Sequence, residues 1–86
     1  MTFYNFMVRR YRDDWGRFGC LAAHMENDKK DFPKNGIGKF DGWHVIIREY
    51  LEEQHADSYY LDIFEEAWKE YELCEKKRLK RKLLTL

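Results

Sequence analysis

Residues 58–71 read SYYLDIFEEAWKEY, and this stretch decides the fold. Its large apolar residues recur at steps of three and four, the spacing of one face of an α-helix. That face consists of Tyr60, Phe64, Ala67, Trp68 and Tyr71. Asp57 or Ser58 can cap the start of this helix with a side-chain oxygen. Because basic residues near a helix C-terminus suit its dipole, the helix can continue past residue 75.

Three further stretches show the same periodicity and predict helices over about 3–11, 18–27 and 42–51. Thr2 and Asp41 stand where a side chain would cap the first and third of these. No alternating strand pattern is present, so we expect an all-α fold, a compact bundle of four short helices. A fifth helix would arise if residues 32–40 form a short turn. The predicted core is Phe3, Phe6, Met7, Leu21, Ile46, Ile47, Tyr50, Leu51, Phe64, Ala67, Trp68 and Tyr71.

The three tryptophans are expected to differ in their surroundings. Trp43 and Trp68 lie on predicted apolar faces, so we expect both to be buried. Trp15 lies in a loop between acidic residues and a glycine, where it could either close the core or remain an exposed contact.

Length and composition exclude several classes of protein. A chain of 86 residues is one small domain. Its longest apolar run is the four residues 20–23, far short of the roughly 20 that span a membrane. The first 30 residues contain no apolar block typical of a signal peptide, and two cysteines are too few for a disulfide scaffold. We therefore expect a cytoplasmic protein with reduced thiols.

The formal net charge of zero hides a strong asymmetry. Residues 1–75 hold 10 Lys or Arg and 16 Asp or Glu, a net charge of −6. Residues 76–86 hold six Lys or Arg and no acid, a net charge of +6. The sequence thus divides into a helical domain over 1–75 and a basic C-terminal helix extension or tail over 76–86.

No motif for catalysis or metal binding emerges. Cys20 and His24 are four residues apart, but a structural zinc site needs four ligands and no second pair has suitable spacing. Cys20 and His24 could also form a nucleophile and base, but no recognisable motif surrounds them. We expect no enzymatic activity, metal, cofactor or small-molecule substrate.

Five segments of the chain, taken in order, resemble the YozE-like family, whose members are short proteins of Gram-positive bacteria. They are TFYNF at 2–6, FGCLA at 18–22, DFPK at 31–34, YL at 50–51 and FEEAWKEY at 64–71. The resemblance covers roughly residues 1–71. It implies a fold like that of the sterile alpha motif (SAM-like) for the domain over 1–75, and it implies no catalytic residues.

The basic tail is the feature that points toward a function. Its cations can neutralise phosphates or pair with acidic groups, either on a protein partner or on the chain's own acidic body. The leucines at 79, 83 and 86 would make a helical tail amphipathic, able to dock on a partner helix or touch an anionic membrane. The candidate contacts are Lys76, Lys77, Arg78, Lys80, Arg81 and Lys82, with Arg9, Arg10 and Arg12.

Two functions remain open. The first is a protein-interaction module that binds an unknown partner or associates with itself. The second is an accessory nucleic-acid-binding protein that uses the basic tail.

Overall fold

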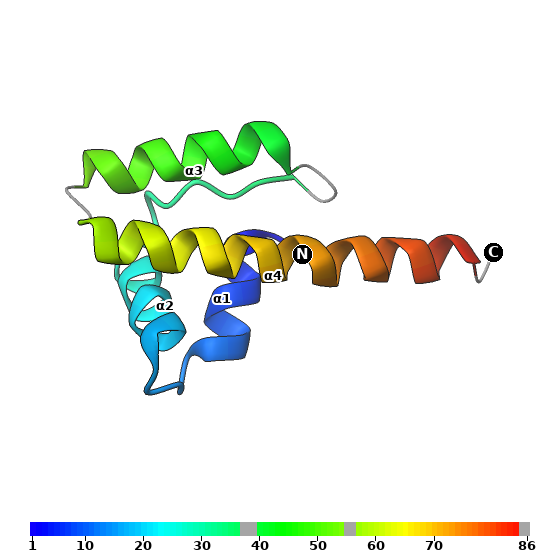
Figure 1. Ribbon diagram of the computed structural model, residues 1–86, viewed down its shortest axis with the longest axis horizontal. Coiled ribbons are helices and arrows are strands. Elements are labelled where there is room, and N and C mark those ends of the chain that lie inside the picture. Colours follow the sequence, from blue (N-terminus) through cyan, green and yellow to red (C-terminus); the bar gives the residue numbers. More distant parts are fainter. Residues whose placement is uncertain (37–39, 55–56, 85–86) are drawn as a thin grey trace.

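The computed structural model of the chain describes residues 1–36, 40–54 and 57–84, the last three by their backbone alone (Figure 1). These residues form four helices and no strand: α1 (Phe3–Tyr11), α2 (Arg17–Asn27), α3 (Asp41–Glu53) and α4 (Ser58–Leu84). The all-α prediction is confirmed. Of the segment 32–40, the described residues contain no further helix, and 37–39 lie outside them.

The longest helix, α4, organises the bundle. It passes between α3 on one side and the pair α1 and α2 on the other, and α3 runs antiparallel to it (Figure 1). At 1.5 Å per residue its 27 residues span about 40 Å, close to the longest dimension of the molecule, 44 Å. α4 crosses residue 75 without a break, as the basic residues after it led us to expect, and it is longer than the other three helices. No helix in the described part of the chain is long and apolar enough to cross a membrane.

Ten of the twelve predicted core residues are buried, and two are not. Ile46 is 45% exposed and Tyr50 only partly buried, because α3 packs on α4 through a narrow stripe that includes Ile47 and Leu51. The hydroxyl of Tyr50 donates a hydrogen bond to Asp28 Oδ2 at 3.3 Å. Further buried apolar residues are Tyr4, Val8, Ala22, Met25, Phe32 and Ile63.

Two of the predicted helix caps are confirmed and one is wrong. Thr2 Oγ1 accepts a hydrogen bond from the amide of Asn5 at 3.1 Å, and Asp57 Oδ1 accepts one from Tyr60 at 3.1 Å. Asp41 is instead the first residue of α3, preceded by Phe40 at the cap position. There its negative charge still suits the positive end of the helix dipole.

The tryptophans occupy three different environments. Trp68 is 4% exposed in the core, Trp43 is partly buried at its edge, and Trp15 is 99% exposed in the loop between α1 and α2. This loop passes close to Gly19, where a Cβ atom would lie 1.9 Å from the carbonyl oxygen of Asp14. Only glycine allows that approach, so Gly19 fixes the loop that carries Trp15.

Candidate binding surface

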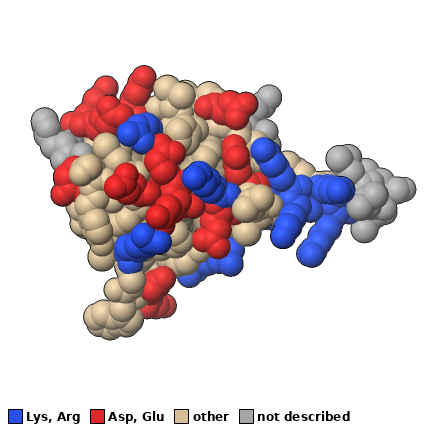
Figure 2. Space-filling view, viewed as in Figure 1, with Lys and Arg blue, Asp and Glu red and all other residues tan. Residues whose placement is uncertain are grey.

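The part of α4 after Glu75, here called the basic extension, leaves the bundle and projects into solvent (Figure 1). Figure 2 shows Lys and Arg gathered along it, while Asp and Glu crowd the bundle beside it. The exposed cations are Lys76, Lys77, Arg78, Lys80 and Arg81. The side chain of Lys82 lies outside the described part of the structure.

At the root of the extension, two cations from α1 meet it. Arg9 and Arg10, near the end of α1, line with Arg78 an open hollow of about 300 Å³. Arg10 Nη1 donates a hydrogen bond to Cys74 Sγ at 3.3 Å, and this bond raises the pKa of Arg10 above its ordinary value. Arg9 and Arg10 lie far from Arg78 in the sequence, so the fold alone makes them neighbours.

Arg12 and Lys76, two of the predicted contact residues, pair with acidic side chains of the bundle. Arg12 pairs with Glu26 Oε1 on α2 at 2.6 Å. Lys76 lies over the ring of Phe40, 5.6 Å from its centroid, and 3.7 Å from Glu72 Oε2. We define the basic surface by the described cations along the extension and at its root, Arg9, Arg10, Lys77, Arg78, Lys80 and Arg81. Within it, Arg78 also lies 3.8 Å from Glu75 Oε1.

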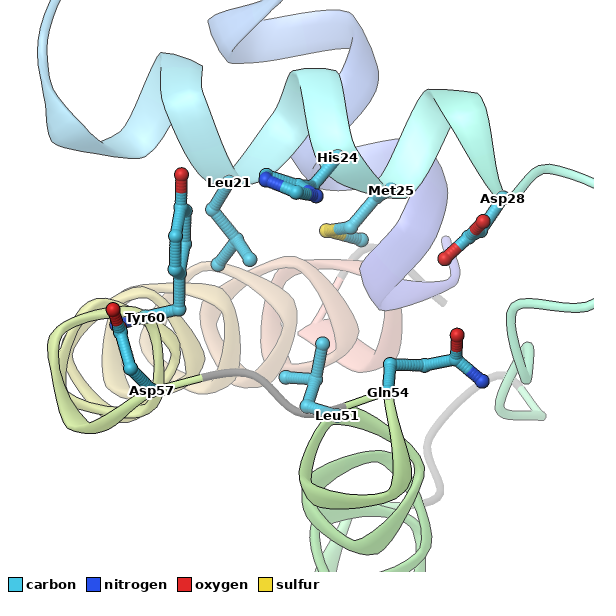
Figure 3. A pocket seen from close by; sticks show the side chains of 8 residues that line it. All are labelled: Leu21, His24, Met25, Asp28, Leu51, Gln54, Asp57 and Tyr60. Carbon is cyan, nitrogen blue, oxygen red and sulfur yellow. The ribbon is translucent and has the colours of Figure 1, made fainter.

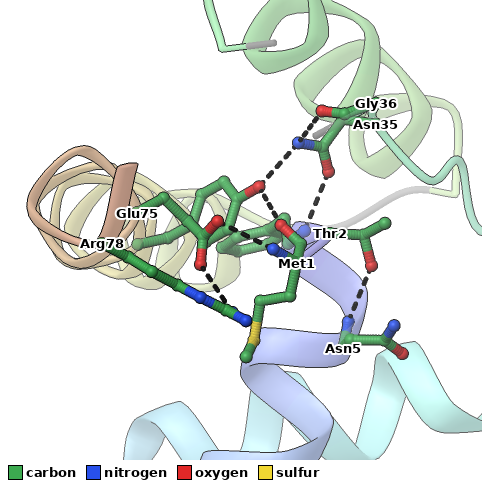
Figure 4. A network of polar contacts seen from close by, with 9 residues as sticks. Met1, Thr2, Asn5, Asn35, Gly36, Glu75 and Arg78 are labelled. Carbon is green, nitrogen blue, oxygen red and sulfur yellow. Dashed lines mark hydrogen bonds and ion pairs between the residues drawn. The ribbon is translucent and has the colours of Figure 1, made fainter. Parts of the chain in front are cut away.

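A buried polar network holds α4 where the extension begins (Figure 4). The amino group of Met1 donates to Glu75 Oε2 at 2.7 Å, and Glu75 is 3% exposed. The hydroxyl of Tyr71 donates to the Met1 carbonyl at 2.6 Å and accepts from Asn35 Nδ2 at 2.7 Å. Asn35 Oδ1 in turn accepts from the Phe3 amide at 2.8 Å. Burial raises the pKa of Tyr71 more than the bond from Asn35 lowers it, which keeps the hydroxyl protonated as a donor.

Sequence reasoning missed both Asn35 and Glu75 as parts of this network. The burial of Glu75 could have been predicted from the sequence, because Glu75 follows Trp68 by seven residues and Tyr71 by four and so lies on the same helical face. No sequence pattern could have identified Asn35, since its partners Phe3 and Tyr71 come from distant parts of the chain.

The acidic bundle also carries internal ion pairs. Glu65 accepts hydrogen bonds across the α3–α4 interface from His44 Nε2 at 2.8 Å and from Arg48 Nη1 at 2.5 Å. Burial raises the pKa of Glu65, but these two bonds outweigh it, so the pKa is lowered overall.

Cys20 and His24, the residues considered for metal binding or nucleophilic chemistry, lie about one turn apart on α2. Cys20 is exposed and Cys74 partly buried, and neither forms a disulfide. His24 packs its ring against Tyr60, with 4.7 Å between the centroids. Within the described ranges, no three His, Cys, Asp or Glu side chains are placed to hold a metal ion.

Comparison with known proteins agrees with the helical architecture. The sequence profile of the YozE SAM-like fold family matches residues 2–73, which covers all of α1, α2 and α3 and most of α4. No curated protein and no solved structure matches the chain. Since the profile spans well over half of its length, the chain belongs to the YozE SAM-like fold family.

Proposed function

We propose that the protein is a non-enzymatic interaction module of the cytoplasm whose basic surface binds an acidic surface on a partner protein. The observation that carries this proposal is the projection of α4. Its exposed cations extend beyond the bundle and meet Arg9 and Arg10 at their root. The residues assigned to the contact are Arg9, Arg10, Lys77, Arg78, Lys80 and Arg81, with Lys82 following on the same extension.

The helical form of the extension supports binding. Its backbone is already ordered as part of α4, so a partner does not bear the conformational cost of folding it. Clustered charge also speeds the encounter with an oppositely charged partner.

Nucleic-acid binding is the second candidate, and the run of cations in residues 76–82 favours it. The net charge of −6 over residues 1–75 weighs against it. A duplex carries one negative charge per about 1.7 Å, so a long polyanion lying along the extension would also approach the acidic bundle. An acidic patch on a protein is finite and can contact the extension alone.

Fluorescence anisotropy on the full chain distinguishes the two candidates. The probes are a labelled polyglutamate peptide, duplex DNA and RNA, each titrated at several salt concentrations. We expect the peptide to bind, and the variant R9Q/K80Q to weaken that binding about tenfold, or about 1.4 kcal/mol. The variant K69E has the same change in net charge, but its exposed residue lies on α4 away from the basic surface and should leave binding unchanged.

The proposal is wrong if the peptide does not bind at low salt or if R9Q/K80Q and K69E behave alike. Tighter binding of DNA or RNA than of the peptide at the same salt concentration would establish the second candidate. In that case the logarithm of affinity should fall with log salt by about 0.9 for each phosphate neutralised.

A further inference from the structure

A pocket lies at the end of α4 opposite to the basic extension, where α2 and α3 end and α4 begins (Figure 3). Its volume is about 140 Å³. Leu21 and Met25 from α2 and Leu51 from α3 point into it and form an apolar floor. A cavity of about 150 Å³ holds one benzene-sized group, so this pocket suits a single side chain rather than a whole helix.

The rim of the pocket is electronegative. Asp28, at the C-terminal cap of α2, and Asp57, ahead of α4, both line it. Gln54 stands at the C-terminal cap of α3 and also lines it. The C-terminal ends of α2 and α3 each add a partial negative charge to the rim, and the start of α4 adds one partial positive charge. The helix dipoles therefore make the rim more negative on balance. An apolar floor beneath an acidic rim matches an alkyl chain that ends in a cation.

We propose that this pocket receives a lysine side chain from the basic extension of a second copy of the chain. The inference rests on the proposed function and names its partner. The methylene stem of the lysine packs on the apolar floor, and its ammonium group lies at the rim that carries Asp28 and Asp57. Lys77 and Lys80 are the donors best suited to this role, because both are exposed and neither takes part in the ion pairs described above.

Charge and position together favour a second copy over another amine. The charges of the two parts, −6 over residues 1–75 and +6 over 76–86, are equal and opposite. The pocket lies beside Asp57 and Tyr60 at the start of α4, whereas the extension is the opposite end of this helix (Figure 1). Two copies can therefore join head to tail, and because the two contact surfaces differ, each added copy leaves one of each surface open. The assembly is expected to grow with concentration instead of stopping at a dimer.

Analytical ultracentrifugation of the full chain tests this assembly. The weight-average mass should rise above the 10.6 kDa of the monomer as concentration increases. It should return toward the monomer when salt is raised from about 0.01 M to about 1 M, over which the Debye length falls from about 30 Å to about 3 Å. A monomer at every concentration in low salt would overturn the inference.

Two variants each block one surface. K77Q/K80Q removes cations from the extension. Q54K/D57N makes the pocket rim more positive, and the asparagine that replaces Asp57 can still cap α4. Each variant alone should remain monomeric. Because each retains the surface that the other lacks, an equimolar mixture should form a one-to-one dimer and grow no further.

Matched controls exclude a general effect of net charge. K69E changes the net charge as K77Q/K80Q does, and E49K changes it as Q54K/D57N does. Glu49 is exposed and lies on the face of α3 opposite to Leu51 by helical spacing. Both controls should assemble like the natural chain. Assembly by either blocked variant alone, or a mixture that stays monomeric, would overturn the inference.

These outcomes are separable from those of the proposed function. A chain that binds polyglutamate through its basic surface but stays monomeric would retain the proposed function and lose this inference. A chain that binds no acidic peptide and does not assemble would lose both.

Discussion

The amino group of Met1 lies 2.7 Å from Glu75 Oε2, and this contact joins the start of the chain to the point where α4 leaves the bundle. The second oxygen of the same carboxylate lies 3.8 Å from Arg78 Nη1 on the basic surface. One buried acid thus connects the N-terminus, the core and the basic extension. It holds α4 in place where the extension begins to project.

The substitution Glu75→Gln tests this attachment. It removes the charge that pairs with the Met1 amine while preserving the size of the side chain, and we expect a loss of about 1–3 kcal/mol in stability. Glu72→Gln is the matched control. It removes an ion pair of 3.7 Å with the exposed Lys76, so this substitution should cost less than about 1 kcal/mol. Urea unfolding measures both. Equal stability of the two variants would show that the contact with Met1 contributes nothing.

Trp68 and Trp15 should respond in opposite ways to truncation. Trp68 packs in the core against Phe3, Phe64 and Tyr71, so Trp68→Ala should cost about 3–5 kcal/mol. Trp15 is 99% exposed, and Trp15→Ala should change stability by less than about 0.5 kcal/mol. Thermal unfolding gives both values. A melting curve unmoved by Trp68→Ala would contradict the packing of α4 described above.

Two glycines provide a paired test of the backbone. A Cβ at Gly19 would lie 1.9 Å from the Asp14 carbonyl oxygen, so Gly19→Ala should destabilise the protein by about 1–3 kcal/mol. A Cβ at Gly42, in the first turn of α3, meets no atom within 4 Å. Because alanine favours the helix, Gly42→Ala should stabilise the protein by up to about 1 kcal/mol. Changes of the same sign would contradict the close approach of the α1–α2 loop to α2.

Glu65 should make stability depend on pH in the acid range. Its pKa is lowered in the folded state, since the bonds from His44 and Arg48 outweigh the effect of burial. The unfolded chain therefore binds the proton more readily than the folded chain. The contribution is complete above the unfolded pKa of about 4.3 and is lost as pH falls through the lower folded pKa.

Unfolding measured across this range should show a smaller loss of stability in acid for Glu65→Gln than for the natural chain. Glu53→Gln, which changes an exposed residue at the end of α3, serves as the control and should keep the natural dependence. If Glu65→Gln lost stability in acid as steeply as the natural chain, the ion pairs across α3 and α4 would not be the cause.

Helix positions could be predicted from the sequence because apolar periodicity is a local signal. The faces around Phe3, Leu21 and Trp68 led directly to α1, α2 and α4. Burial was harder to predict where it depends on the neighbours of a helix. Ile46 lies on an apolar helical face, but α3 packs through a stripe too narrow to cover it.

The candidate surface was only partly predictable for the same reason. The cations of residues 76–82 are adjacent in the sequence and could be identified there. That Arg9 and Arg10 join Arg78 depends on how α1 packs against α4. The pocket beside Asp28 and Asp57 forms where the ends of three helices converge. A local sequence pattern does not indicate which helix ends will lie together, so the pocket could not be predicted.

NMR chemical-shift mapping shows whether the basic surface recognises acidic groups on a protein. A polyglutamate peptide is titrated into the ¹⁵N-labelled full chain at low salt. We expect shifts concentrated at the amides of Arg9, Arg10 and residues 76–81, and these shifts should disappear when salt is raised. Absence of shifts, or shifts concentrated on α2 and α3 instead, would contradict the proposed function.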